Sequence, residues 1–252
     1  MRNWINRLLK FLGFGGSTSN PKFCYVKGVG LSSGPTPSHS LAFLSSIGVS
    51  PKGKTWEKGK EIRIAFIGGT QAQRAMVKKY GGEWLSNPKY PLPLTFKYVS
   101  LKQSSDVRIS FEKGVGSWSY LGTDAKFVSS SKATMNFSWL DAQVIRHEFG
   151  HMVGALGHEH AHKDRTFEFD EKAVMKSVSN PPNNWSYKTA FHNIFRKASE
   201  KTHNFSYYNP NSIMLYFYPP SWTKSGKGTN RNEVISEGDF KFIVYLYLTM
   251  EA

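Results

Sequence analysis

The stretch that decides the fold runs from Val144 to His160 and reads VIRHEFGHMVGALGHEH. His147 and His151 are four residues apart, so on a helix their imidazole rings lie on one face, one turn apart. This spacing lets both rings bind a single zinc ion at about 2.0–2.1 Å. Glu148 is next to the first histidine, where its carboxylate can take a proton from a zinc-bound water. The stretch therefore predicts a hydrolytic zinc site on a helix.

The residues around this motif strengthen the prediction, because two histidines four residues apart also occur by chance on ordinary helices. Gly154 ends the helix three residues after His151 and lets the chain turn. A further histidine, His158, follows directly after that turn. The motif is also flanked by apolar residues, as expected of a half-buried core helix: Val144, Ile145, Phe149 and Val153. The whole pattern favours a metal site over a chance pairing.

The order His-Glu-x-x-His-x-x-Gly at 147–154, followed by His-Glu-His at 158–160, resembles the zinc signature of the metzincin peptidases. The His-Glu-His ending and the later Asp164-Arg165 are similar to the astacin branch of these enzymes. The resemblance implies a zinc-dependent endopeptidase, which uses Zn²⁺ to hydrolyse peptide bonds in protein or peptide substrates. In such an enzyme Glu148 accepts the proton of the zinc-bound water and delivers it to the leaving amine.

The third metal ligand is the point at which the sequence departs from the family pattern. The family places its third histidine three residues after the glycine, a position that holds glycine here, and His158 lies one residue later. A glycine inserted into a turn is sterically tolerated. We therefore assign the third ligand to His158, beside His147 and His151. His160 and His162 remain alternatives for this third position.

A second match to the same family lies downstream, at Asn209–Tyr216, and contains the pattern Ser-x-Met-x-Tyr. It resembles the Met-turn of the astacin branch. The resemblance implies that Met214 forms an apolar floor beneath the metal. It also implies that the hydroxyl of Tyr216 binds zinc in the resting enzyme and later stabilises the oxyanion. Each residue alone would be read as an ordinary core side chain, but their order after the zinc motif favours the functional reading.

Strands and helices alternate before the zinc motif, and the chain becomes mostly irregular after it. Strands are expected at Glu61–Ile67, Leu94–Ser100, Val107–Phe111, Ser117–Gly122 and Thr134–Phe137. Helices are expected at Thr70–Leu85, Leu140–Gly154, Glu171–Val178, Tyr187–Ala198 and Ser236–Leu248. With the resemblance, this pattern predicts an α+β fold of the zincin (metzincin-like) type. A twisted mixed β-sheet with backing helices lies above an active-site helix, followed by a mostly irregular and helical C-terminal subdomain.

We expect the metalloprotease catalytic domain to span residues 55–252, with an N-terminal subdomain at about 55–154 and a C-terminal subdomain at about 155–252. Residues 1–54 are expected to form an N-terminal extension of an amphipathic segment and flexible linkers rich in glycine and serine. In the family, an edge strand above the cleft pairs with extended substrate. Ser117–Asp124 or its neighbour is expected to supply that strand.

The charge and the N-terminal segment suggest further partners. The chain of 252 residues has 33 Lys and Arg against 18 Asp and Glu, a formal charge of +15, which favours contact with anionic surfaces. No nucleic-acid module with a stacking motif is recognised, so nucleic acid is not an expected partner. Met1–Leu12 has the pattern of a basic amphipathic helix suited to peripheral membrane contact, but it makes a poor signal peptide. Secretion or export is therefore expected from the family resemblance alone.

Two other functions fit parts of the sequence. A DNA-associated zincin protease would explain the basic charge, and a catalytically silent zinc-binding module or toxin component would explain the histidines. The single cysteine, Cys24, excludes an internal disulfide framework and a four-cysteine zinc site. Because Glu148 and Tyr216 are both present, and a silent site needs neither, the sequence favours the active peptidase.

Overall fold

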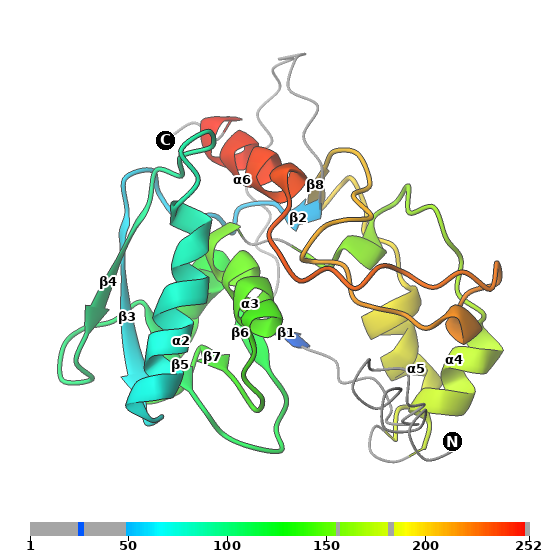
Figure 1. Cartoon of the computed structure of the whole chain (residues 1–252), viewed down its shortest axis with the longest axis horizontal. Helices are drawn as coiled ribbons and strands as arrows, with labels where there is room; N and C mark the ends of the chain where they lie inside the picture. The colour runs from blue at the N-terminus through cyan, green and yellow to red at the C-terminus, as the bar shows by residue number, and fades with distance from the viewer. Residues whose placement is uncertain (1–24, 28–48, 155–156, 181–183, 250–252) are drawn as a thin grey trace, which may run out of the picture.

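The structure is a computed structural model of the chain, and it describes residues 25–27, 49–154, 157–180 and 184–249. A β-sheet with helices packed on it makes up one side of the molecule in Figure 1, and short helices and loops make up the other. The mixed α+β architecture expected from the sequence is confirmed. The expected amphipathic segment at Met1–Leu12 lies outside the described residues, as does Cys24.

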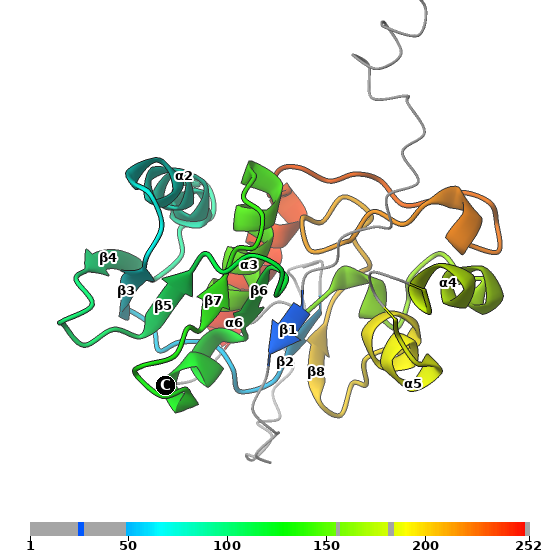
Figure 2. The ribbon, with the colours of Figure 1, turned by 90° about the horizontal axis from the view of Figure 1, so that it is seen from below.

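Six strands form the sheet in the order β1-β6-β7-β5-β3-β4, seen side by side in Figure 2. Neighbouring strands are parallel, except that β6 runs antiparallel to β7. The six strands are β1 (Tyr25–Lys27), β3 (Glu61–Ile67), β4 (Thr95–Val99), β5 (Val107–Ser110), β6 (Trp118–Tyr120) and β7 (Met135–Asn136). The five strands expected between residues 61 and 137 are thus all present, some slightly shorter than predicted.

Three longer helices surround the core beside the sheet. They are α2 (Gln71–Gly82), α3 (Ala142–Gly154) and α6 (Glu237–Thr249). Thr70 caps α2 as predicted, because its hydroxyl accepts the backbone N–H of Gln73 while the Gln73 side chain accepts that of Thr70. A 3₁₀ turn, η1 (Glu83–Leu85), extends α2 to the predicted end. Helix α3, which carries the zinc motif, packs closely against α2 and contributes Ile145, Phe149 and Val153 to the main hydrophobic core.

The region after α3 consists of short elements around a second, smaller core. It contains the helices α4 (Glu171–Val178) and α5 (Tyr187–Ala190), the 3₁₀ turns η3 (Glu159–Ala161) and η5 (Pro220–Trp222), and the π-helix η4 (Phe191–Phe195). The helix expected at Tyr187–Ala198 therefore ends at Phe195, and its second half is wider than an α-helix. Within that π-turn the carbonyl of Asn193 accepts a hydrogen bond from the ring of His160, a tertiary contact that sequence periodicity does not encode.

The folded part begins before the expected domain start near residue 55. Strand β2 (Val49–Pro51) pairs antiparallel with β8 (His203–Phe205), which joins this segment to the C-terminal region. The carbonyl of Val49 also accepts the backbone N–H of Gly157, and the Ser50 hydroxyl donates to the carbonyl of Gly154. Residues 49–51 therefore contact both Gly154, at the end of α3, and Gly157, next to the zinc motif.

None of the helices in the described ranges combines the length and apolar character that a membrane crossing requires.

Candidate metal centre

Helix α3 presents the first two histidines of the motif from its buried face. The side chain of Asp141 accepts the backbone N–H of Val144 at 2.8 Å and so caps the first turn of the helix. The rings of His147 and His151 lie 4.8 Å apart, centroid to centroid, and both residues are buried. The helical spacing predicted from the sequence thus places both rings on one side of α3.

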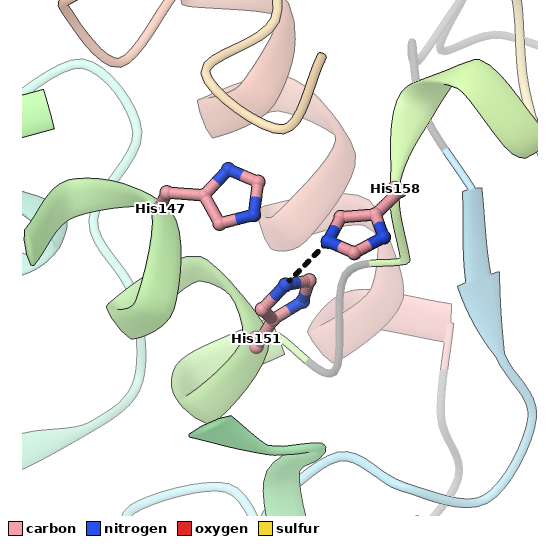
Figure 3. Close-up of side chains that lie close together, drawn as sticks. All are labelled: His147, His151 and His158. Carbon is pink, nitrogen blue, oxygen red and sulfur yellow. Dashed lines mark hydrogen bonds between the residues drawn. The ribbon is translucent and has the colours of Figure 1, made fainter. Parts of the chain in front are cut away.

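His158, which follows α3 in the chain, lies beside these two histidines, as Figure 3 shows. One ring nitrogen from each of His147, His151 and His158 lies within 4.8 Å of the others. The Nε2 atoms of His151 and His158 are 3.1 Å apart. Among the described residues, these three form the one cluster of His, Cys, Asp or Glu side chains whose geometry could hold a metal ion.

The two alternative histidines point elsewhere. His160 donates from Nε2 to the carbonyl of Asn193 at 3.0 Å. His162 donates from Nε2 to the carbonyl of Ser206 at 2.9 Å, and its Nδ1 accepts the backbone N–H of Asp164. Both nitrogens of His162 are therefore occupied by the backbone. The structure brings His158 to the cluster and leaves the other two outside it, although the ligand role itself remains a prediction.

The chemistry of the three rings fits a divalent zinc ion. His147 donates from Nδ1 to the carbonyl of Ile213 at 2.9 Å, so its Nε2 carries the lone pair. This Nε2 is buried and has no hydrogen-bond partner among the described residues. Burial lowers the pKa of His147 to about 4 and holds the pKa of His158 well below the ordinary value. Both rings are therefore neutral near pH 7, the form that binds a metal.

Glu148 follows the first of these histidines on α3, and its side chain is completely buried. Its carboxylate is thus held by a helix inside the protein rather than by a surface loop. The sequence predicts that this group moves protons during the reaction, and its burial beside the histidine cluster is consistent with that role.

The Met-turn lies against the cluster. The hydroxyl of Tyr216 is 2.5 Å from Nε2 of His158, and its ring stacks on His147 with centroids 5.0 Å apart. Met214 is buried, and its sulfur would lie 2.5 Å from a Cβ atom added at Gly150 of α3. Met214 therefore packs against α3, and the tyrosine hydroxyl lies beside Nε2 of His158. The roles expected for the two residues stay predictions.

Strand β6 lies within the segment expected to pair with extended substrate, and it runs antiparallel to its neighbour β7. On the side of β6 that faces away from β7, strand β1 pairs with it in parallel. Tyr25 lies opposite Trp118, and Lys27 lies opposite Tyr120. The N-terminal segment thus covers the backbone of β6 in this structure.

Three buried polar residues near the cluster were not assigned to the site from the sequence. Glu159 accepts the backbone N–H of Asn209 at 2.6 Å and donates its own N–H to the carbonyl of Met214. Ser212 and Asp239 hydrogen-bond to each other at 2.5 Å. Asp239 lies in the first turn of α6. Its contacts to a loop 26 and 27 residues away left no signal in the local pattern.

The sequence profile of the astacin family of peptidases matches residues 49–229, more than half of the chain and including both the zinc motif and the Met-turn. The chain belongs to the astacin family. Astacins are zinc-dependent metallopeptidases, so the chain is a zinc metalloendopeptidase that acts on protein or peptide substrates.

Solved structures of myroilysin resemble this astacin in fold and in sequence. One is 34% identical and superposes with a TM-score of 0.72, over 79% of this chain and 98% of the myroilysin chain. Another is 31% identical with a TM-score of 0.58, over 93% of each chain. No curated protein sequence shows significant similarity.

Proposed function

We propose that His147, His151 and His158 bind the catalytic zinc of this astacin and that Glu148 acts as the proton carrier of peptide hydrolysis. The observation that carries this proposal is the convergence of three ring nitrogens within 4.8 Å, one of which, Nε2 of His147, is buried and has no hydrogen-bond partner among the described residues. A buried acceptor without a hydrogen-bond donor lowers the stability of the fold, and a metal ion bound to that nitrogen would remove this cost.

Zinc, when bound there, would polarise the scissile carbonyl and make a water molecule more acidic. Glu148 accepts a proton from the attacking water and delivers it to the leaving amine, so the carboxylate ends the cycle as it began. Its burial removes competing solvent from the proton transfer.

Tyr216 supplies the second protein group of the proposed reaction. Its hydroxyl lies 2.5 Å from Nε2 of His158, the nitrogen that zinc would take. Once that lone pair is occupied, the phenol must find another acceptor. The oxyanion that develops on the substrate carbonyl is such an acceptor, and a hydrogen bond to it lowers the barrier. Met214 supplies the apolar floor against α3.

Zinc content measured together with peptidase activity tests the ligand set. His158→Ala should lose both zinc and the cleavage of casein, whereas His160→Ala should retain zinc because its ring faces Asn193. The two variants are matched, since both remove an imidazole from the same turn, where His160 is buried and His158 is half-buried. Retention of zinc in His158→Ala with loss in His160→Ala would move the third ligand to His160. Full activity in the presence of a chelator would refute the metal proposal altogether.

The same assay addresses the other expectations from the sequence. Cleavage stimulated by DNA in a salt-sensitive manner would favour a DNA-associated protease, to which the charge of +15 would contribute. A zinc-loaded protein without any peptidase activity would favour a silent binding module. Export from the cell is proposed on the family resemblance alone, and fractionation of the producing cells tests it.

A further inference from the structure

A chain of hydrogen bonds links the first histidine of the motif to a buried carboxylate on α6. His147 donates from Nδ1 to the carbonyl of Ile213 at 2.9 Å. The same peptide group donates through the N–H of Met214 to the hydroxyl of Ser212 at 3.0 Å. That hydroxyl in turn donates to Oδ1 of Asp239 at 2.5 Å. One peptide group therefore connects the imidazole to the acid.

We propose that Ser212 and Asp239 are positioning residues for His147, which they hold in the tautomer and orientation that present Nε2 to the metal. The inference rests on the proposed role of His147 as a zinc ligand and extends it to residues that do not touch the metal. Metal-binding histidines commonly donate their second nitrogen to a carboxylate or carbonyl that fixes the ring. Here the carbonyl and the carboxylate act in series.

The surroundings of the Asp239 carboxylate support this role. Its residue is 3% exposed and Ser212 is 1% exposed, so water does not compete for either group. Its second oxygen, Oδ2, accepts the backbone N–H groups of Ile213 and Ser236 and the Ser236 hydroxyl. Burial raises the pKa of the Asp239 carboxyl, but four donors converge on it, and these hydrogen bonds oppose that shift and favour the charged form.

A negative charge at the end of such a chain strengthens each bond along it, because buried hydrogen bonds polarise one another. The carbonyl of Ile213 becomes a better acceptor, and the ring of His147 becomes a better electron donor at Nε2. The chain also ties together three separate segments, since His147 lies on α3, Ser212 in the Met-turn and Asp239 on α6. Correct placement of the ring therefore depends on all three.

Two serines that contact Asp239 provide a matched pair of variants. Ser212→Ala removes the link to His147, whereas Ser236→Ala removes a donor to Oδ2 and the cap of α6 but leaves the link intact. Both variants should lower the melting temperature. Only Ser212→Ala should weaken zinc binding, by about ten-fold in chelator competition, the lower end of the range for residues that support a ligand.

A second readout needs neither activity nor metal. In the full chain stripped of zinc and labelled with ¹⁵N-histidine, His147 should show a protonated Nδ1 and a bare Nε2. Asp239→Asn keeps the shape of the side chain but reverses the direction of its hydrogen bond with the Ser212 hydroxyl, because the amide donates where the carboxylate accepts. We expect this variant, unlike Ser236→Ala, to mix the two tautomers of His147 and to weaken zinc binding.

The outcomes separate this inference from the proposed function. Unchanged zinc content in His147→Ala would refute the ligand role on which it rests. Loss of zinc in His147→Ala combined with unchanged zinc affinity in Ser212→Ala would overturn the positioning role alone. Equal loss of zinc affinity in Ser212→Ala and Ser236→Ala would also overturn it, since general destabilisation would then explain both.

Discussion

Single residues carry the chemistry of this astacin because burial sets their protonation states. The histidine rings are neutral near pH 7 since desolvation penalises their charged form, and neutral rings are the ones that coordinate a metal. Glu148 is enclosed by the same core. The predictions at this scale concern one side chain at a time.

Glu148→Gln should leave zinc bound, since the ligand nitrogens are untouched, while turnover falls by at least about 100-fold because the amide cannot carry the proton. Metal analysis and a fluorogenic peptide assay on the same sample measure both effects. Substantial remaining proteolysis would show that another group is the base.

Tyr216→Phe should lower kcat by about 100-fold, the typical effect of losing one donor to an oxyanion, with little change in KM. The ring still packs on His147 and the zinc content should be unchanged. Steady-state kinetics on one peptide checks this split. A rise in KM at constant kcat would indicate instead that the tyrosine binds substrate in its ground state.

The zinc-free protein should lose stability as the pH falls. The pKa values of His147 and His160 are about 4 and about 3 in the folded protein, below the ordinary value of 6.5, because both rings are buried. At pH values between the folded pKa and the ordinary pKa, the unfolded chain binds more protons than the folded chain. The free energy of unfolding therefore decreases on acidification below about pH 6.5. At pH 5 the cost is about 2 kcal/mol for each ring.

Urea denaturation of the chelated protein at pH 7.5 and 5.0 measures this pH dependence. His160→Gln should remove part of it, and replacement of the exposed His192 by Gln should leave it unchanged. A midpoint that does not move between the two pH values would contradict the prediction.

Secondary-structure elements place these residues, and their close packing leaves little freedom. Helices α2 and α3 approach each other at Gly81, where an added Cβ atom would lie 2.4 Å from the ring of Phe149. Sequence periodicity predicts each helix well, because its apolar stripe and its caps are local. The contact between the helices is not local. From the sequence alone, Gly81 indicates only that the end of the helix is weak, because glycine has a low helix propensity.

The neighbouring glycines of α2 give a matched test of this packing. Gly81→Ala should destabilise the protein by about 1–3 kcal/mol through overpacking against α3. Gly82→Ala meets no atom within 4 Å and should be neutral or stabilising by about 0.5–1 kcal/mol, the gain in helix propensity. Chemical denaturation of both variants checks the contrast, and equal effects would contradict the proposed helix contact.

The whole molecule combines a sheet region and a region of short helices, with the histidine cluster contributed by α3 and the turn that follows it. The N-terminal strand β1 adds to the sheet beside β6, so the backbone edge suited to an extended peptide is already paired. Strand addition at a sheet edge is a common way to bind peptides. We therefore expect β1 and an extended substrate to compete for the same hydrogen bonds of β6.

Deletion of residues 1–27 should lower KM for an extended peptide, because it frees the edge of β6, while kcat should change little. A shorter deletion of residues 1–20 leaves β1 in place and serves as the control. Kinetics on one peptide substrate compares the two truncated proteins with the full chain. Identical KM values in all three would show that β1 does not obstruct substrate.

The sequence by itself determined what is local: the helix with two histidines and a glutamate close together, the Met-turn pattern, and most of the strands and helices between residues 61 and 249. These follow from periodicity, capping and spacing, which depend on neighbours along the chain. Only the tertiary structure decided which later histidine joins His147 and His151, because the direction of a turn depends on what packs against it. The link from His147 to Asp239 was likewise invisible, since its members meet only when α3, the Met-turn and α6 are folded together.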